Sequence, residues 1–310
     1  MTITTPAALR RRRPAAATGQ RRCTLLAAAV AALGAGIALT SVLGPLVLGL
    51  LRYRTSPTTL NQLLGSDAAA LFVIAPLTVV AAVLVLRRLV AGVLLASGIG
   101  VFALYTYAQV VIGQEYLRLP GNVEQFFPLL LAVFLLAEAT VVLALRAAPT
   151  DLPAMSRRLE RLAGGALLAV ALFLVFGQHL RPMLVAWSDP TSLTEYASSP
   201  TPFWLVKLMD LGIVVPIATA TGIGLLRRAA WARRVAYPLL TAYTLLGVSV
   251  TAMGVVMNLH ADPDASLALT AAFAVFTAVF AALTAALYRA VFAQHADPPD
   301  NATTSEESPQ

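Results

Sequence analysis

The sequence predicts an all-α, polytopic membrane protein with about eight transmembrane helices. Three observations lead to this prediction: 58% of the residues are hydrophobic, only 12% are charged, and the mean hydropathy is +0.78. A soluble domain carries roughly 25% charged residues, so most side chains are expected to face lipid or other helices. Because a spanning helix needs about 20 apolar residues, the 310 residues accommodate eight spans and leave no room for a separate soluble domain.

The apolar runs that form these spans are separated by short polar or basic connections. The first run extends from residue 23 to about residue 51, and the basic segment before it also fits a signal peptide. Since this run is about twice as long as a signal core, we expect a retained, tilted helix; cleavage would leave seven. The other runs lie at about 68–86, 90–112, 127–145, 164–187, 203–226, 235–257 and 267–291. They lack the period-two alternation of barrel strands, so all are predicted to be helices.

Polar segments frame this apolar region. Residues 1–22 are predicted to form a disordered basic tail and residues 293–310 a disordered C-terminal tail, so residues 23–292 are the transmembrane domain. Between the fourth and fifth runs, Leu152, Met155, Leu159 and Leu162 recur at helical spacing among arginines. This connection is predicted to be either a short amphipathic helix on the membrane surface or only a basic connector.

The basic residues predict the orientation of the bundle. If the eight runs alternate in direction, 17 of the 22 Lys and Arg residues fall on the side of the N-terminus. The other side receives Arg52, Arg54, Arg118, Arg181 and Lys207. Because cytoplasmic loops are enriched in Lys and Arg, both termini are predicted to lie in the cytoplasm. This distribution also explains the net charge of +7 without a nucleic-acid partner.

Two stretches of the chain share a spacing of proline and arginine. Pro76 is followed after eleven residues by Arg87–Arg88, and Pro216 after eleven residues by Arg227–Arg228. An aspartate precedes each proline, and a Tyr-Thr pair follows in the next run: Asp67 with Tyr105-Thr106, and Asp210 with Tyr243-Thr244. The pattern predicts two parallel four-helix units, residues 23–146 and 163–292, a plan found in transporters. The alternative is that prolines and paired arginines simply recur in apolar helices.

Ionisable residues within apolar runs are candidate functional groups, because a charge in the bilayer costs about 2.5–3.5 kcal/mol. Glu138, in the middle of the fourth run, is predicted to be an intramembrane acid that relays protons or makes a structural hydrogen bond. Lys207 and Asp210 lie one helical turn apart and are expected to pair. Polar side chains crowd the outer third of the bundle and predict a cavity that opens outward. Its predicted members are Asp67, Tyr105, Gln109, His179, Arg181, Lys207 and Asp210. Alternatively, polar residues are merely tolerated near the interface.

The cysteine and histidine content limits the chemistry. Cys23 is the only cysteine, and His179, His260 and His295 are the only histidines, so disulfides, CxxC redox pairs and metal clusters are not expected. The chain also lacks a Walker loop and the HExxH, GxSxG and DxxxD motifs. We therefore predict no cofactor and no metal ion. The expected partners are the lipid bilayer and an unidentified small molecule or membrane protein.

Four short motifs resemble a group of bacterial multi-spanning membrane proteins of unknown function. They are Leu64-Gly-Ser-Asp-Ala68, Tyr105-Thr-Tyr-Ala108, Asp210-Leu-Gly-Ile-Val-Val-Pro216 and Leu225-Leu-Arg-Arg228, and the resemblance spans roughly residues 60–255. It implies a location in the bacterial cytoplasmic membrane, marks Asp67 and Asp210, and implies no particular activity.

Three functions agree with this sequence. The first is a transporter-like protein with an outward-facing polar cavity. The second is a membrane-embedded enzyme acting on a lipid substrate, with Asp67, His179 or Asp210 in acid–base roles. The third is a non-catalytic scaffold or sensor subunit. The scarcity of conventional catalytic groups counts against the enzyme.

Overall fold

The computed structural model describes residues 13–149, 152 and 154–296, and this part of the chain is helical and contains no strand. Eight of its segments are long and apolar enough to cross a membrane. They are Gln20–Leu43, Pro57–Leu86, Val90–Ile112, Val123–Ala147, Arg157–Ser188, Pro200–Leu226, Ala230–Leu259 and Leu267–Ala293. The prediction of an all-α fold with eight candidate membrane spans is therefore confirmed.

Several spans consist of more than one helical element. The first span belongs to α1 (Arg13–Leu43), and the second comprises α2 (Pro57–Ala69), η1 (Ala70–Ile74) and α3 (Ala75–Leu86). The third span is α4 (Val90–Ile112). The fourth comprises η2 (Val123–Phe126) and α5 (Phe127–Ala147). The fifth span comprises α6 (Arg157–Leu172), η3 (Phe173–His179) and α7 (Leu180–Ser188). The sixth comprises α9 (Pro200–Met209), η5 (Asp210–Val214) and α10 (Val215–Leu226). The last two are α11 (Ala230–Leu259) and α12 (Leu267–Ala296), while η4 (Pro190–Ser192) and α8 (Thr194–Ser198) connect α7 to α9.

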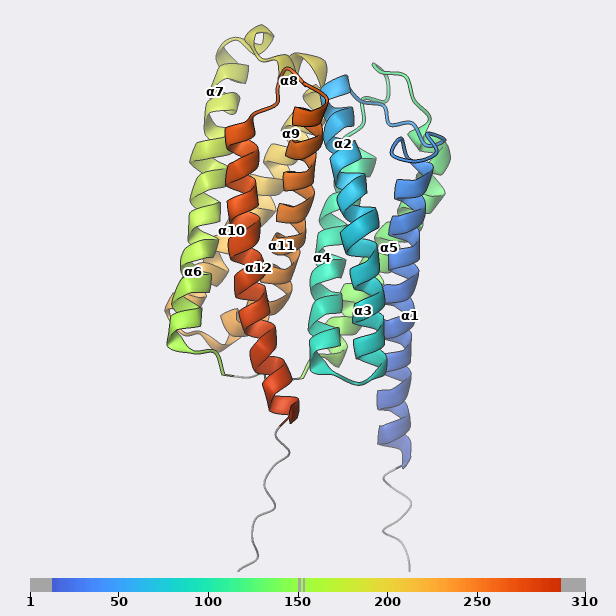
Figure 1. Cartoon of the computed structure of the whole chain (residues 1–310), viewed down its shortest axis with the longest axis vertical. Coiled ribbons are helices and arrows are strands. Elements are labelled where there is room, and N and C mark those ends of the chain that lie inside the picture. Colours follow the sequence, from blue (N-terminus) through green and yellow to red (C-terminus); the bar gives the residue numbers. More distant parts are fainter. Residues whose placement is uncertain (1–12, 150–151, 153, 297–310) are drawn as a thin grey trace, which may run out of the picture.

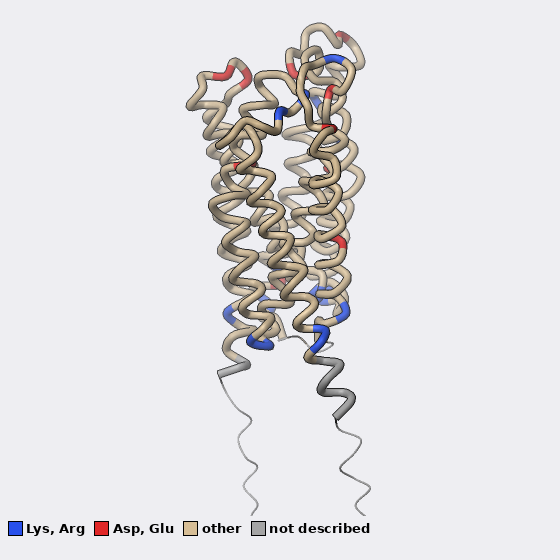
Figure 2. The backbone as a smooth tube through the Cα atoms, turned by 90° about the vertical axis from the view of Figure 1, so that its right-hand side faces the viewer, with Lys and Arg blue, Asp and Glu red and all other residues tan. Residues whose placement is uncertain are grey.

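Both ends of the described chain lie at the same end of the bundle (Figure 1). We call this the terminal end and the opposite one the distal end. Figure 2 shows Lys and Arg positions gathered at the terminal end, while most acidic positions lie toward the distal end. Which end faces the cytoplasm stays a prediction.

Two helix boundaries differ from those expected. Helix α1 begins at Arg13 rather than residue 23, because alanines favour helix, and it ends at Leu43, since Gly44 and Pro45 do not continue it. Residues 157–162 form the first turns of the fifth span instead of a separate surface helix, with Ser156 capping the N–H of Leu159. Of the tails predicted at residues 1–22 and 293–310, residues 1–12 and 297–310 lie outside the described residues, and residues 13–22 and 293–296 belong to α1 and α12.

The bundle contains two hydrophobic cores. The first joins α1, α3, α4 and α5 around buried side chains such as Leu33, Ile37 and Phe102. The second joins α6, α10, α11 and α12 around Leu167 and Leu225. Helices α4 and α11 contribute to both cores and contact each other, and α2 packs along α11. The chain thus folds as two four-span groups, which meet along α2, α4 and α11 (Figure 1).

The second and sixth spans share a local structure at a separation of 140 residues. Each has a π-helical segment, η1 or η5, directly before the helix that carries Pro76 or Pro216. The wide turn is explained by the missing proline N–H, which removes a hydrogen bond from the preceding turn. Each span is then followed, two residues after its end, by an arginine in the left-handed conformation, Arg88 at φ 59° or Arg228 at φ 61°. A duplicated four-helix unit would produce this agreement, and the duplication stays a prediction.

Candidate functional sites

Asp67 is surrounded by hydroxyl groups. It lies on α2, ten residues after Pro57, and therefore about 15 Å from the distal end of its span. Ser41 of α1 donates a hydrogen bond of 3.4 Å from its hydroxyl to one carboxylate oxygen. Tyr53, from the loop between α1 and α2, donates one of 3.3 Å to the other. The residue is only 8% exposed, so a carboxylate is buried among donors that carry no positive charge.

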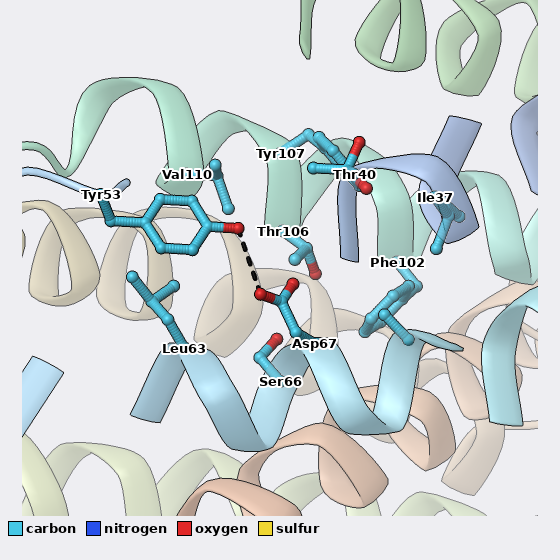
Figure 3. A pocket seen from close by; sticks show the side chains of 11 residues that line it. Ile37, Thr40, Tyr53, Leu63, Ser66, Asp67, Phe102, Thr106, Tyr107 and Val110 are labelled. Carbon is cyan, nitrogen blue, oxygen red and sulfur yellow. Dashed lines mark hydrogen bonds between the residues drawn. The ribbon is translucent and has the colours of Figure 1, made fainter. Parts of the chain in front are cut away.

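A cavity of about 20 Å³ lies beside the Asp67 carboxylate (Figure 3). Its polar lining consists of Thr40, Tyr53, Ser66, Asp67, Thr106 and Tyr107. Its apolar lining consists of Ile37, Leu63, Ala70, Phe102 and Val110. The volume corresponds to about one water molecule. Of the seven residues predicted to form an outward-facing cavity, Asp67 alone lines this one.

The loop that carries Tyr53, one of the lining residues, is joined to a second distal loop. Tyr53 belongs to the stretch after α1, whose backbone pairs with the stretch after α4: the N–H of Glu115 donates to the Arg54 carbonyl at 2.8 Å, and that of Asn122 to the Arg52 carbonyl at 3.0 Å. An ion pair between Arg54 and Glu124 joins the same two stretches. The loops therefore hold the Tyr53 hydroxyl in place above Asp67.

Asp210 is the centre of a second buried cluster, which contains four of the predicted site residues. His179 Nε2 lies 2.8 Å from one oxygen of the Asp210 carboxylate, and the Tyr105 hydroxyl donates to the other. Gln109 lies beside Tyr105, one turn further along α4. His179 is 6% exposed and Asp210 is 9% exposed. Because Tyr105 comes from α4, this cluster joins the two four-span groups.

Both members of the His179–Asp210 pair lie in π-helical segments. His179 is the last residue of η3, and Asp210 is the first residue of η5. These segments belong to the fifth and sixth spans and contact each other. A π-helical turn interrupts the regular hydrogen bonding of a helix and is frequent at functional sites. The pair thus connects two spans where each has an irregular backbone.

Lys207 does not form the ion pair with Asp210 that the sequence predicts. Its ammonium group donates to the Phe203 carbonyl at 3.3 Å and lies 3.2 Å from the centroid of the Phe203 ring. Both contacts stabilise a buried cation, and Lys207 is 5% exposed. Asp210 is satisfied by His179 and Tyr105 instead.

Two other predicted residues lie on the surface of the bundle. Arg181, on α7, has an exposed side chain. Glu138, in the middle of α5, is also exposed. The seven predicted cavity residues therefore divide into the Asp67 cluster, the Asp210 cluster with Lys207 nearby on the same span, and the surface position of Arg181.

Three buried acids with structural partners, Glu115, Glu160 and Asp262, were not predicted as a site. Glu160 of α6 lies 3.3 Å from Arg228 and 2.6 Å from Arg233, measured from guanidinium nitrogen to carboxylate oxygen, and joins α6 to the α10–α11 turn. Glu115 accepts a 2.7 Å hydrogen bond from the N–H of Thr201. In the sequence these acids stand out only as charged residues near predicted helix ends, and that position does not specify which residues they contact. The hydroxyl partners of Asp67 had no signal, since serine, threonine and tyrosine are common in apolar helices.

Comparisons of the chain with protein-family models, with curated proteins and with solved structures find no match. The class of the protein therefore follows from the architecture of its described residues: eight apolar helices that can cross a membrane, with buried ionisable groups between them. The resemblance to a bacterial membrane-protein group stays a prediction.

Proposed function

We propose that this protein is a transporter-like, multi-pass protein of the bacterial cytoplasmic membrane that moves protons, with the His179–Asp210 pair as its proton-binding site. The observation that carries the proposal is the 2.8 Å contact between His179 Nε2 and an Asp210 carboxylate oxygen, buried between two candidate membrane spans. Ionisable groups at such depth are costly and mark ion or proton pathways in membrane proteins.

The chemistry of the pair fits proton exchange. Imidazole and carboxylate share a proton across a hydrogen bond, and each can hold it alone when the contact breaks. His179 and Asp210 belong to different spans and sit in π-helical segments. A relative movement of the two spans would therefore change which group holds the proton. The Tyr105 hydroxyl, which donates to Asp210, supplies a third group able to pass a proton.

The proposed orientation places both termini in the cytoplasm. It is supported by the crowding of Lys and Arg at the terminal end (Figure 2) and by the positive-inside rule. Cys23 is the only cysteine, so Cys23→Ser gives a background for labelling. In intact cells, an impermeant maleimide should label Asp264→Cys at the distal end, and Arg227→Cys only after permeabilisation. The reverse pattern would invert the orientation.

Proton flux in proteoliposomes tests the proposed function. The purified protein is reconstituted around a pH-sensitive dye, and a valinomycin–potassium gradient makes the interior negative. We expect the parent protein to acidify the interior faster than protein-free vesicles do. Asp210→Asn and His179→Gln should reduce the rate to that of protein-free vesicles, because each removes one of the two exchanging groups.

The control variant is Asp189→Asn. Asp189 follows α7 at the distal end and is exposed. This change therefore removes a carboxylate next to the fifth span and leaves the His179–Asp210 pair unchanged. It should retain the parental rate. Size-exclusion profiles and Tm values establish that each variant is folded. Parent vesicles that acidify no faster than protein-free vesicles would contradict proton translocation.

A further inference from the structure

We propose that the cavity beside Asp67 is a binding site for one small monovalent cation, Na⁺ or Li⁺. The site is separate from the His179–Asp210 pair, and the inference does not depend on the proposed proton flux. Three properties support it: the charge of the cavity, the oxygen atoms that line it, and its size.

The charge of the cavity favours a cation. Asp67 is buried, and its two hydrogen-bond partners, Ser41 and Tyr53, are neutral. A buried carboxylate without a positive partner is strongly destabilising. Ser41 also lies two residues before the end of α1 at Leu43, and the C-terminal end of a helix carries a partial negative charge of about half an electron. A bound cation would compensate both.

The lining supplies the ligands that such a cation prefers. Hard cations take oxygen ligands, and a carboxylate with several neutral oxygens is a typical set. In Figure 3 the Asp67 carboxylate faces the Tyr53 hydroxyl, and the hydroxyls of Ser66 and Thr106 lie on either side of it. A hydroxyl can rotate its hydrogen away and present a lone pair. Of the lining residues, Asp67 on α2, Tyr53 from the loop after α1 and Thr106 on α4 can therefore supply oxygens from three separate segments of the chain.

Size and charge select the kind of cation. The cavity of about 20 Å³ accommodates one water-sized species, which fits Na⁺ or Li⁺ more closely than the larger K⁺. Asp67 is the one carboxylate among the lining residues, so a monovalent ion gives neutrality and a divalent ion leaves excess charge. The described residues also contain no group of three or more His, Cys, Asp or Glu that could hold a metal ion. A multi-carboxylate divalent site is thus not formed here.

The test measures Tm of the full-length protein in detergent at pH 8, in NaCl, KCl or N-methylglucamine chloride of equal ionic strength. A ligand that binds only the folded state stabilises it, so Na⁺ at about ten times its Kd should raise Tm by about 3 °C or more relative to N-methylglucamine. K⁺ should raise it less. Asp67→Asn should remove the Na⁺ effect, and Asp210→Asn, as the matched buried acid, should retain it.

Binding of radioactive ²²Na⁺ to the purified protein provides the second measurement. Thr106→Val and Tyr53→Phe, which keep Asp67 and each remove one lining hydroxyl, should weaken ²²Na⁺ binding several-fold. They keep the test decisive if Asp67→Asn fails to fold. Equal Tm values in Na⁺ and N-methylglucamine, with no ²²Na⁺ binding, would overturn the proposal. A full Na⁺ effect in Asp67→Asn would overturn it as well.

Discussion

Asp67 and Asp210 are buried acids at the same depth in two similarly built spans, yet they have different partners. Each lies ten residues after the proline that begins its span, Pro57 or Pro200. Asp67 is held by the hydroxyls of Ser41 and Tyr53. Asp210 is held by the hydroxyl of Tyr105 and by His179. One acid therefore has only hydroxyl donors, whereas the other also has an imidazole partner, which can carry a positive charge.

The difference arises from the distance between each acid and the π-helical turn. The second span has 30 residues and the sixth has 27. The sixth span is shorter because it lacks three residues between its aspartate and its π-helical turn. Asp67 precedes η1 by three residues, while Asp210 begins η5. Since a π-helical turn changes the direction of the side chains around it, Asp210 faces η3 of the neighbouring span and Asp67 faces α1. Equal depth thus does not produce equal surroundings.

The largest expected effect concerns how closely the two spans are packed. A Cβ at Gly65 would lie 2.5 Å from backbone atoms of Ala252 and Met253 on α11, whereas one at Gly212 would meet only Leu208 at 3.8 Å. Gly65→Ala should therefore lower the free energy of unfolding by about 3 kcal/mol, the upper part of the range for overpacking. Gly212→Ala should change it by less than about 0.5 kcal/mol. Unfolding curves in detergent measure both, and equal effects would show that α2 yields to the added methyl.

The second prediction concerns the sign of the effect when each acid is neutralised. In Na⁺-free buffer at pH 8, Asp210→Asn should destabilise the protein by about 2 kcal/mol, because buried hydrogen bonds to a charged group are lost. Asp67→Asn should stabilise it, since it removes a buried charge with no positive partner. Thermal unfolding of the two variants and of the parent in this buffer measures the sign of each stability change. Destabilisation by both changes would mean that the two acids are equally well satisfied.

The third prediction compares the tyrosines. Tyr105→Phe should cost about 1.5 kcal/mol, as expected for a hydrogen bond to a charged group, and Tyr53→Phe about 0.5 kcal/mol. The reason is that the Tyr53 hydroxyl lies 3.3 Å from its acceptor, which is long for a bond between oxygens. Unfolding curves at pH 7 would reveal the order, and a larger cost for Tyr53→Phe would contradict it.

The smallest expected effect lies at the distal end, where the α11–α12 loop meets the first turns of α2. Asp262 of the α11–α12 loop accepts hydrogen bonds from Asn61 at 2.7 Å and Thr58 at 3.1 Å, both on α2. Burial acts to raise the pKa of Asp262, but the bonds from Asn61, Thr58 and the Asp264 N–H outweigh it and lower that pKa.

A lowered pKa means that the ionised Asp262 favours the folded state. Its contribution is present above the unfolded-state pKa of about 3.9 and is lost as the pH falls through the lower folded-state value. Asp262→Asn should cost less than about 1 kcal/mol at pH 7, and the difference from the parent should shrink below pH 4. A difference that stays constant from pH 7 to pH 3 would show that ionisation is not involved.

Part of the Asp210 cluster could be predicted from sequence. Tyr105, Gln109, His179 and Asp210 stand out as polar residues at similar depth in apolar runs, and the structure brings these four together. Depth alone also selected Asp67 and Arg181, which lie elsewhere. The rotation of each helix decides which residues of equal depth meet, and a π-helical turn changes that rotation. The hydropathy pattern does not indicate this rotation.

The sequence by itself determined the helical class, the eight candidate spans and the paired arginines that end two of them. These features depend on the rise of a helix, the thickness of a bilayer and the properties of individual residues, all of which are local. Only the tertiary structure decided that Asp67 is surrounded by hydroxyls and that Asp210 meets His179. Those contacts join residues that lie 26 and 31 positions apart, and they depend on how neighbouring spans pack and rotate against one another.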